Sequence, residues 1–334
     1  MRTLALLCIV LFINSYHAAP HSEDNNEKTL IPRELFDQSH LKYKAEHDIV
    51  DIIVPINALN FDEAMKESDS QSESRETDLT DVTVFLVEAD LKDGKRNYQG
   101  LYLYKHNKTK MILPNGRAVA SSFAENKIVY FGASDGLYIY NTNSKTAEKF
   151  GGFTDSIIDI ATYKDGKHIY ILTEDHKLYN VTNDGVDKEL LEDVEGAMEI
   201  VLDDSENIYF YDSNKDVFMK NADGVTKIQG LPNGAQSLKL LRPPHIMEES
   251  VPLMLDNALY VVFANGTSIS TDLEFSPDAI PTAYCTDAVS VQYYAFNKDL
   301  YEFNLIGLIA MEFFGRAHRK AENIVSKAER GKNY

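Results

Sequence analysis

The sequence has almost no cysteine, so disulfide bonds cannot hold its fold together. Its 334 residues include two cysteines, Cys8 and Cys285, and no tryptophan. We expect Cys8 to be removed with an N-terminal leader, which leaves Cys285 without a partner. A domain without disulfides needs a large core of its own. We expect Cys285 to be a small buried residue of an inner strand; the alternative, a reactive thiol, has no histidine beside it in the sequence.

Long apolar runs are absent after the first 20 residues, so no later segment predicts a membrane span. The N-terminal stretch combines Arg2, an apolar run over Leu4–Ile13, and small residues at Ala18 and Ala19. This pattern is typical of a secretory signal peptide, and the run is too short to cross a bilayer. The sequence therefore predicts a signal peptide over residues 1–18 and a soluble protein secreted to the extracellular space.

Positive charge is scarce. The chain has 33 Lys and Arg against 52 Asp and Glu, which gives a formal net charge of −19. Such a surface repels the phosphates of nucleic acids and the headgroups of anionic lipids. We therefore expect neither nucleic acid nor a membrane as a partner of the main body of the protein.

Catalytic and metal-binding spacings are absent as well. The sequence contains no GxSxG, no HExxH, no glycine-rich phosphate loop and no CxxC. The histidines are scattered, and no two share a spacing that suggests a metal-binding face. We predict from this that the protein is not an enzyme, with no catalytic residue, no metal and no cofactor.

What the sequence does contain is a repeat of short alternating strands. Residues 125–150 read as three strands separated by turns of Asn, Asp, Ser and Gly, which tolerate tight dihedrals. Similar hairpins recur at 168–181, 207–220, 258–270 and 291–303, and a looser copy lies upstream. The second hairpin strands mark six units about 40 residues apart, at Leu101, Leu137, Leu178, Val217, Thr267 and Leu300. A four-stranded unit with this period is typical of a β-propeller.

The repeat predicts an all-β fold, a six-bladed β-propeller of TolB-like or regucalcin-like architecture over residues 81–315. A β-sandwich with coincidental hairpins is the alternative, but five copies share the positions of their aromatic residues. The first unit lacks an inner strand, so a strand from elsewhere must close the ring. Val50–Ile56 is the first candidate for this strand, and Ile324–Ser326 is the second.

Two segments outside the repeats differ in composition. We predict that residues 19–80 are an acidic, largely disordered extension, because 62–78 is acidic, rich in serine and free of aromatics. Residues 316–334 form a basic tail with a weak helical stripe. This tail is either a frayed terminal helix or a docking site for an acidic protein partner.

Three sites fit the pattern for N-glycosylation, at Asn107, Asn180 and Asn265. Each lies at or beyond the end of a predicted second strand, where the turn should face solvent. We therefore expect a glycosylated rim.

Two carboxylates are candidate channel residues. Counting back from the hairpins places Asp159 and Glu199 at matching positions of adjacent inner strands, with Val119 at the matching place in unit two. If both face the central channel, their oxygens could hold a divalent cation, as in metal-dependent lactonases built on six-bladed propellers. If they face a blade interface, each needs a hydrogen-bond partner instead.

Aromatic residues are abundant, with 19 Tyr and 16 Phe. The tyrosines in the repeat register should fill the space between blades, or else stack on a planar ligand near a channel mouth. They are Tyr102, Tyr130, Tyr138, Tyr170, Tyr179, Tyr209, Tyr260, Tyr293 and Tyr301.

Three stretches carry a resemblance to a known family: SSFAENKIVYFGASDGLYIYN at 121–141, DSIIDIATYKDGKHIYILTEDHKLYNVT at 155–182 and EIVLDDSENIYFYDSNKDVF at 199–218. Together with the repeat pattern over roughly 81–310, they resemble the ommochrome-binding proteins of insect haemolymph. The resemblance implies a secreted carrier that binds a planar aromatic pigment of the ommochrome type without catalysis. It supplies no ligand-binding residues, and the acidic extension has no counterpart in it.

Two other functions stay open at this point. A metal-dependent lactonase or esterase would use Asp159 and Glu199 to hold a divalent ion that polarises a carbonyl. A protein-binding scaffold would use a propeller face or the basic tail.

Overall fold

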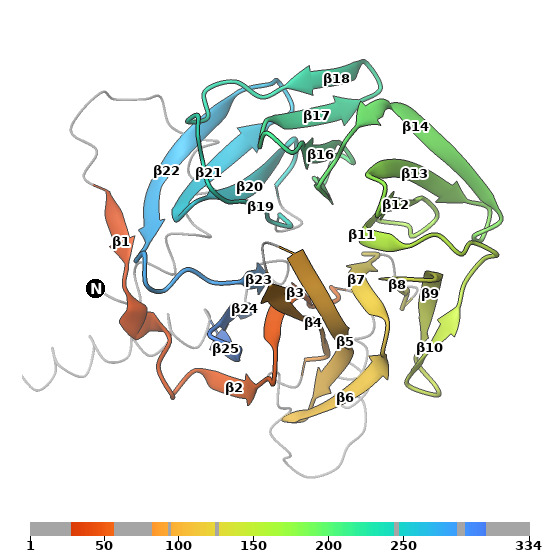
Figure 1. Cartoon of the computed structure of the whole chain (residues 1–334), viewed down its shortest axis with the longest axis horizontal. Coiled ribbons are helices and arrows are strands. Elements are labelled where there is room, and N and C mark those ends of the chain that lie inside the picture. Colours follow the sequence, from red (N-terminus) through yellow and green to blue (C-terminus); the bar gives the residue numbers. More distant parts are fainter. Residues whose placement is uncertain are drawn as a thin grey trace, which may run out of the picture.

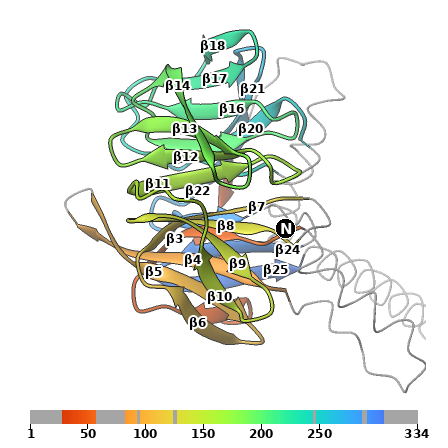
Figure 2. The ribbon, with the colours of Figure 1, turned by 90° about the vertical axis from the view of Figure 1, so that its right-hand side faces the viewer.

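The computed structural model describes residues 28–56, 82–92, 95–123, 127–243, 247–285 and 291–304. In these residues, six small sheets stand around a common axis, which confirms the predicted six-bladed β-propeller (Figure 1). Figure 2 shows the same molecule turned by 90°. No helix in this part of the chain has the length and apolarity needed to span a membrane. The predicted signal peptide, the segment 62–78 and the basic tail lie outside the described residues.

The first three blades follow one another along the chain, and each has its first-named strand nearest the axis and its last-named strand outermost. Blade 1 contains β3 (Asp48–Ile53), β4 (Val84–Lys92), β5 (Lys95–Lys105) and β6 (Lys108–Leu113). Blade 2 contains β7 (Gly116–Ser121), β8 (Val129–Ala133), β9 (Gly136–Asn141) and β10 (Thr146–Lys149). Blade 3 contains β11 (Ile157–Thr162), β12 (Ile169–Thr173), β13 (Lys177–Thr182) and β14 (Asp187–Glu195).

Of the remaining blades, blades 5 and 6 each gain an outermost strand from the N-terminal part of the chain. Blade 4 contains β15 (Glu199–Leu202), β16 (Ile208–Tyr211), β17 (Val217–Asn221) and β18 (Gly224–Lys227). Blade 5 contains β19 (Leu238–Leu240), β20 (Ser250–Leu255), β21 (Ala258–Phe263), β22 (Ser268–Phe275) and, outermost, β1 (Thr29–Ile31). Blade 6 contains β23 (Ala283–Cys285), β24 (Val291–Phe296), β25 (Asp299–Asn304) and, outermost, β2 (Leu41–Lys44). The 3-10 turn η1 (Arg33–Leu35) connects β1 and β2.

The N-terminal segment closes the ring by contributing to three blades. Strand β1 runs parallel to β22, β2 pairs antiparallel with β25, and β3 pairs antiparallel with β4. The prediction that the Val50–Ile56 run supplies the missing inner strand is therefore confirmed by β3. The predicted domain boundary at residue 81 is wrong for this segment, because residues 29–53 belong to the propeller and not to a disordered extension.

Blade 5 also differs from the expected strand pairing. The hairpin predicted over 258–270 lies one strand further out, as β21 and the start of β22, and β20 is the second strand. The reason is that β20 reads SVPLML and carries Pro252 where other second strands carry an aromatic residue. Without that aromatic residue, the sequence pattern of the second and third strands was assigned to β21 and β22, one strand too far out.

Aromatic side chains pack the blades against one another. Phe85 of blade 1 contacts Phe131 and Tyr140 of blade 2, with ring centres 5.3 and 5.0 Å apart. The second-strand tyrosines are buried as predicted, at Tyr130, Tyr170, Tyr209 and Tyr293. In the third strands Tyr301 is buried, whereas Tyr102, Tyr138, Tyr179 and Tyr260 are half-buried. Cys285 is buried in the inner strand β23, also as predicted.

Candidate functional site

The channel contains two hollows, one at each end of the inner strands. Residues near the starts of these strands line the first, which we call the charged hollow; its volume is about 30 Å³. Residues at and beyond their ends line the second, which we call the apolar mouth; its volume is about 60 Å³. Strand β11 illustrates the arrangement, because Asp159 near its start lines the charged hollow, whereas Tyr163 just after its end lines the apolar mouth.

The two carboxylates predicted from the sequence both line the charged hollow. Asp159 pairs across its blade with Leu172, and Glu199 pairs with Tyr211 at the equivalent place. Strand register makes Ala118, and not Val119, their counterpart in blade 2. A bulge between Ile157 and Asp159 shifts the register of β11 just before the channel residue.

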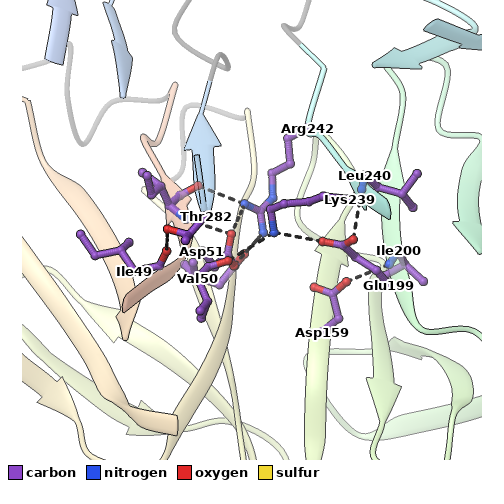
Figure 3. Close-up of polar contacts among 12 residues, drawn as sticks. Ile49, Val50, Asp51, Asp159, Glu199, Ile200, Lys239, Leu240, Arg242 and Thr282 are labelled. Atoms are coloured by element: carbon purple, nitrogen blue, oxygen red, sulfur yellow. Dashed lines mark hydrogen bonds and ion pairs between the residues drawn. The ribbon is translucent and has the colours of Figure 1, made fainter. Parts of the chain in front are cut away.

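Each of these carboxylates also ties its own blade to the next one (Figure 3). Asp159 accepts hydrogen bonds from the backbone N–H of Ile160 at 2.9 Å and from that of Ile200, in blade 4, at 2.8 Å. Glu199 accepts from the backbone N–H of Leu240, in blade 5, at 3.0 Å. The sequence left open whether these carboxylates face the channel or a blade interface. They do both, because they line the channel and also accept hydrogen bonds from the next blade.

Asp51 and Lys239 occupy the equivalent positions in blades 1 and 5, and sequence reasoning missed both. Lys239 Nζ lies 3.3 Å from Glu199 Oε1 and donates to the carbonyl of Val50 at 3.3 Å. The count that found Asp159 could not find Lys239, because in this unit it would have started from the misaligned hairpin of blade 5. The same count could not find Asp51, because β3 lies far upstream in the sequence of the β4–β5 hairpin with which it pairs.

Arg242 reaches from blade 5 to Asp51 of blade 1 near the axis (Figure 3). Its guanidinium holds Asp51 through two nitrogens, at 2.8 and 3.1 Å. It also donates to the carbonyl of Ile52 at 3.1 Å and to that of Val119 at 2.8 Å. One side chain thus joins blades 5, 1 and 2 near the axis, and it lines both hollows.

The surroundings of the carboxylates change their proton affinities in opposite directions. Burial, followed by the charge of Glu199, raises the pKa of Asp159 to about 7. Burial would also raise the pKa of Asp51, but the Arg242 guanidinium outweighs it and holds that pKa below its usual range. Asp51 is therefore a stable anion at neutral pH, whereas Asp159 titrates near neutrality.

We expect this to make the free energy of unfolding depend on pH through Asp159. Its pKa is raised on folding, so its contribution is largest below about pH 4 and is lost as pH rises through 7. The shift corresponds to about 4 kcal/mol, and water in the hollow should reduce this to roughly 2 kcal/mol. Urea unfolding of the wild-type protein and of Asp159→Asn between pH 5 and 8 measures this pH dependence. The wild type should lose more stability than the variant over this range, and identical pH profiles would contradict the assignment.

The charge balance of the charged hollow does not suit a metal cation. Its carboxylates are Asp51, Asp159 and Glu199, and its cations are Arg96, Arg117, Lys239 and Arg242. Four cations face three carboxylates in this lining, and Glu174 just beyond it forms an ion pair with Arg117 at 3.2 Å, so the formal charges balance without a metal ion. In the described residues no group of three His, Cys, Asp or Glu side chains is placed to hold a metal ion. The contacts of Asp159 and Glu199 therefore give the hydrolase hypothesis no support.

The apolar mouth has a different character. Its apolar lining includes Ile53, Ile56, Phe123, Tyr163, Leu202 and Pro243. Phe123, which also lines this mouth, is 37 % exposed. The Tyr163 ring is held in place by Tyr170, whose hydroxyl donates to the Tyr163 hydroxyl at 2.9 Å. At the rim, Lys164 and Asp204 form an ion pair at 3.0 Å that joins blades 3 and 4. The mouth thus combines an apolar floor, an exposed aromatic ring and charged edge groups.

The three predicted glycosylation sites do not have equivalent surroundings. Asn107 and Asn265 are exposed in turns. Asn180 lies inside β13, half-buried, and its side-chain amide contacts the His168 ring at 3.3 Å. Only the first two positions match the exposed turns expected of the rim, and their glycosylation stays a prediction.

No protein-family model matches the chain, and no curated protein matches it. The function therefore has to be argued from the two hollows themselves.

Proposed function

We propose that this protein is a secreted, non-catalytic carrier that binds a small planar aromatic ligand at the apolar mouth. The observation that carries the proposal is the exposed Phe123 ring beside an apolar hollow. A flat aromatic ligand would cover this ring and the apolar floor, and both contacts are favourable in water. A propeller channel is largely preformed, so binding need not reorganise the scaffold.

The size of the hollow limits how the ligand sits. A volume of about 60 Å³ takes the edge of one ring, not a whole polycyclic molecule. We infer that the ligand inserts one edge and lies flat against Phe123, with the rest extending over the mouth. Polar substituents would then reach Lys164 and Asp204 at the rim.

The resemblance to the ommochrome-binding proteins of insect haemolymph suggests which planar ligand to try. An ommochrome is a polar aromatic pigment, so it fits a mouth with an apolar floor and charged edges. We therefore propose an ommochrome-type pigment as the ligand and haemolymph as the compartment.

A titration of purified protein with an ommochrome, followed by visible absorption, tests this proposal. We expect a pigment-induced spectral shift with micromolar or tighter affinity, equivalent to about −8 kcal/mol or better. Phe123→Ala should weaken binding roughly tenfold, because it removes the stacking surface. Phe123→Tyr should keep wild-type affinity. A model lactone assayed beside the pigment should show no turnover.

Leu190 provides a matched control on the outer strand β14, because it is 38 % exposed, almost the same as Phe123. Leu190→Ala removes a comparable apolar surface far from the mouth and should leave affinity unchanged. Failure of the wild type to bind any ommochrome at micromolar sensitivity would overturn the proposal. Equal affinity of Phe123→Ala and the wild type would show that the ligand does not bind against Phe123.

A further inference from the structure

The charged hollow is partly covered by a hairpin from blade 1. Strands β4 and β5 pair from Val84 and Tyr104 as far as Lys92 and Lys95, well beyond the length of the other hairpins. Figure 1 shows the start of β5 near the middle of the ring. Arg96, near this start, interacts with the charge of Glu199 in blade 4, and Tyr98 interacts with that of Asp159 in blade 3. The hairpin thus brings a guanidinium to the axis from outside the inner strands.

Hydrogen-bond donors exceed acceptors in this hollow. Arg96 interacts with the Tyr98 hydroxyl and with the charge of Glu199, and within the described residues this leaves most of its five N–H groups without an acceptor. Arg117 uses one nitrogen for Ser156 and Glu174, and its guanidinium lies over the Tyr98 ring at 5.3 Å.

The carboxylates of the hollow make their hydrogen bonds to other groups. Asp159 accepts from two backbone N–H groups, and Glu199 accepts from one backbone N–H group and from Lys239. Asp51 accepts from Arg242. The side chain of Arg96 is exposed to solvent at the same time. A hollow with unused guanidinium donors is complementary to an anion that brings acceptors and no donors.

We propose that the charged hollow is a second ligand site, which takes the oxyanion group of a small molecule, a carboxylate or a phosphate or sulfate ester. Arg96 binds it with its planar fork of N–H groups, and Arg117 and Lys239 add positive charge from blades 2 and 5. The enclosed volume of about 30 Å³ fits two water-sized atoms, enough for the oxygens of one such group. The remainder of the ligand extends out past the hairpin. This site lies at the opposite end of the inner strands from the apolar mouth, so the proposal does not rest on pigment binding.

The site should bind anions more tightly as pH falls. Asp159 faces Glu199 of β15, Asp51 of β3, Tyr98 of β5 and Tyr211 of β16, and the guanidinium of Arg242 lies nearby. Proton uptake by Asp159 near pH 7 removes one of the three negative charges. The formal charge of the hollow, with Glu174 included, then rises from zero to one positive charge.

Titration calorimetry of the full-length protein tests the site. The probes are sulfate and acetate, whose own charges do not change between pH 6 and 8, with ionic strength held constant by chloride. We expect saturable binding to the wild type, tighter at pH 6 than at pH 8. Arg96→Gln should weaken it roughly tenfold, the loss expected for one charge-assisted hydrogen-bonded pair.

Lys95→Gln is the matched control, because it removes the same charge from the adjacent exposed position of β5. This variant should bind within about twofold of the wild type, since a solvated charge is screened. If Lys95→Gln and Arg96→Gln lost anion affinity equally, the binding would come from general electrostatic attraction, and the proposed site would be overturned. Wild-type affinity in Arg96→Gln, or no saturable binding to the wild type, would overturn it as well. Both residues are exposed, so melting temperatures should stay close to the wild type and exclude misfolding.

Discussion

A chain that lacks residues 28–56 will fail to form the closed ring. This segment contributes strands to blades 5, 6 and 1, and β3 is an inner strand next to the axis. Burial of one such apolar side chain contributes about 1.5–3 kcal/mol, so five contribute roughly 8–15 kcal/mol, as much as the whole stability of a typical domain. The five residues, each at most 3 % exposed, are Ile49, Val50, Ile52, Ile53 and Val54.

Urea unfolding followed by circular dichroism measures this effect. The chain beginning at residue 57 should show no cooperative transition, and a synthetic peptide of residues 28–56 added in excess should restore one. In the full chain, Ile52→Ala is a graded version that should cost about 2–5 kcal/mol. Leu30→Ala, at a position 54 % exposed on β1, should cost less than about 0.5 kcal/mol. A truncated chain with the midpoint of the full chain would show that the ring does not depend on this closure.

Replacing Arg242 by methionine will destabilise the protein by about 3 kcal/mol at neutral pH. The substitution keeps most of the side-chain length but leaves Asp51 as a largely buried carboxylate without its cation, which is the costly way to break such a pair. The carbonyls of Ile52 and Val119 lose a donor at the same time. Arg33→Met serves as the control, because its ion pair with Asp278 is exposed on both sides and should matter little.

The pH dependence of this variant provides a second, independent check. In the wild type, Arg242 keeps the pKa of Asp51 below its usual range, so Asp51 stabilises the fold above about pH 4 and loses this effect in acid. Without Arg242, burial is opposed only by the weaker effects of Lys239 and Arg96, so we expect that pKa to rise above its usual range and the sign to reverse. The loss of unfolding free energy in Arg242→Met, relative to the wild type, should therefore be smaller at pH 5 than at pH 7.5. Adding Asp51→Asn should recover part of the loss, and a pH-independent deficit that Asp51→Asn leaves unchanged would contradict the pairing.

The fold could be predicted from the sequence because each blade repeats its buried positions. Second strands such as those containing Tyr130, Tyr170 and Tyr209 alternate aromatic and branched residues, and this pattern depends only on local burial. Blade 5 was misaligned because Pro252 takes the place of the aromatic. Strands β1 and β2 were missed because they are three and four residues long and lie at blade edges. Edge strands of that length carry little hydrophobic signal, so tertiary pairing alone defines them.

The channel was predicted in part for a similar reason. Asp159 and Glu199 precede their hairpins by nearly constant distances, so their alignment follows from the repeat. Arg96 and Arg242 come from a hairpin tip and from the chain after β19, and no repeat fixes where such side chains point. Phe123 had no signal in the sequence that set it apart from the phenylalanines of the core. Its exposure beside the apolar mouth emerges only when blades 2, 3 and 4 are placed together.

Hydrogen exchange of the backbone, measured with and without bound ommochrome, tests the proposed carrier function most directly because it locates the ligand. The proposal predicts slower exchange in peptides that cover 120–123, 161–164 and 200–206, which line the apolar mouth. Peptides that cover 95–98 and 237–240, at the charged hollow, should exchange as they do without pigment. Slower exchange confined to the charged hollow, or no change in any peptide at saturating pigment, would contradict binding at the apolar mouth.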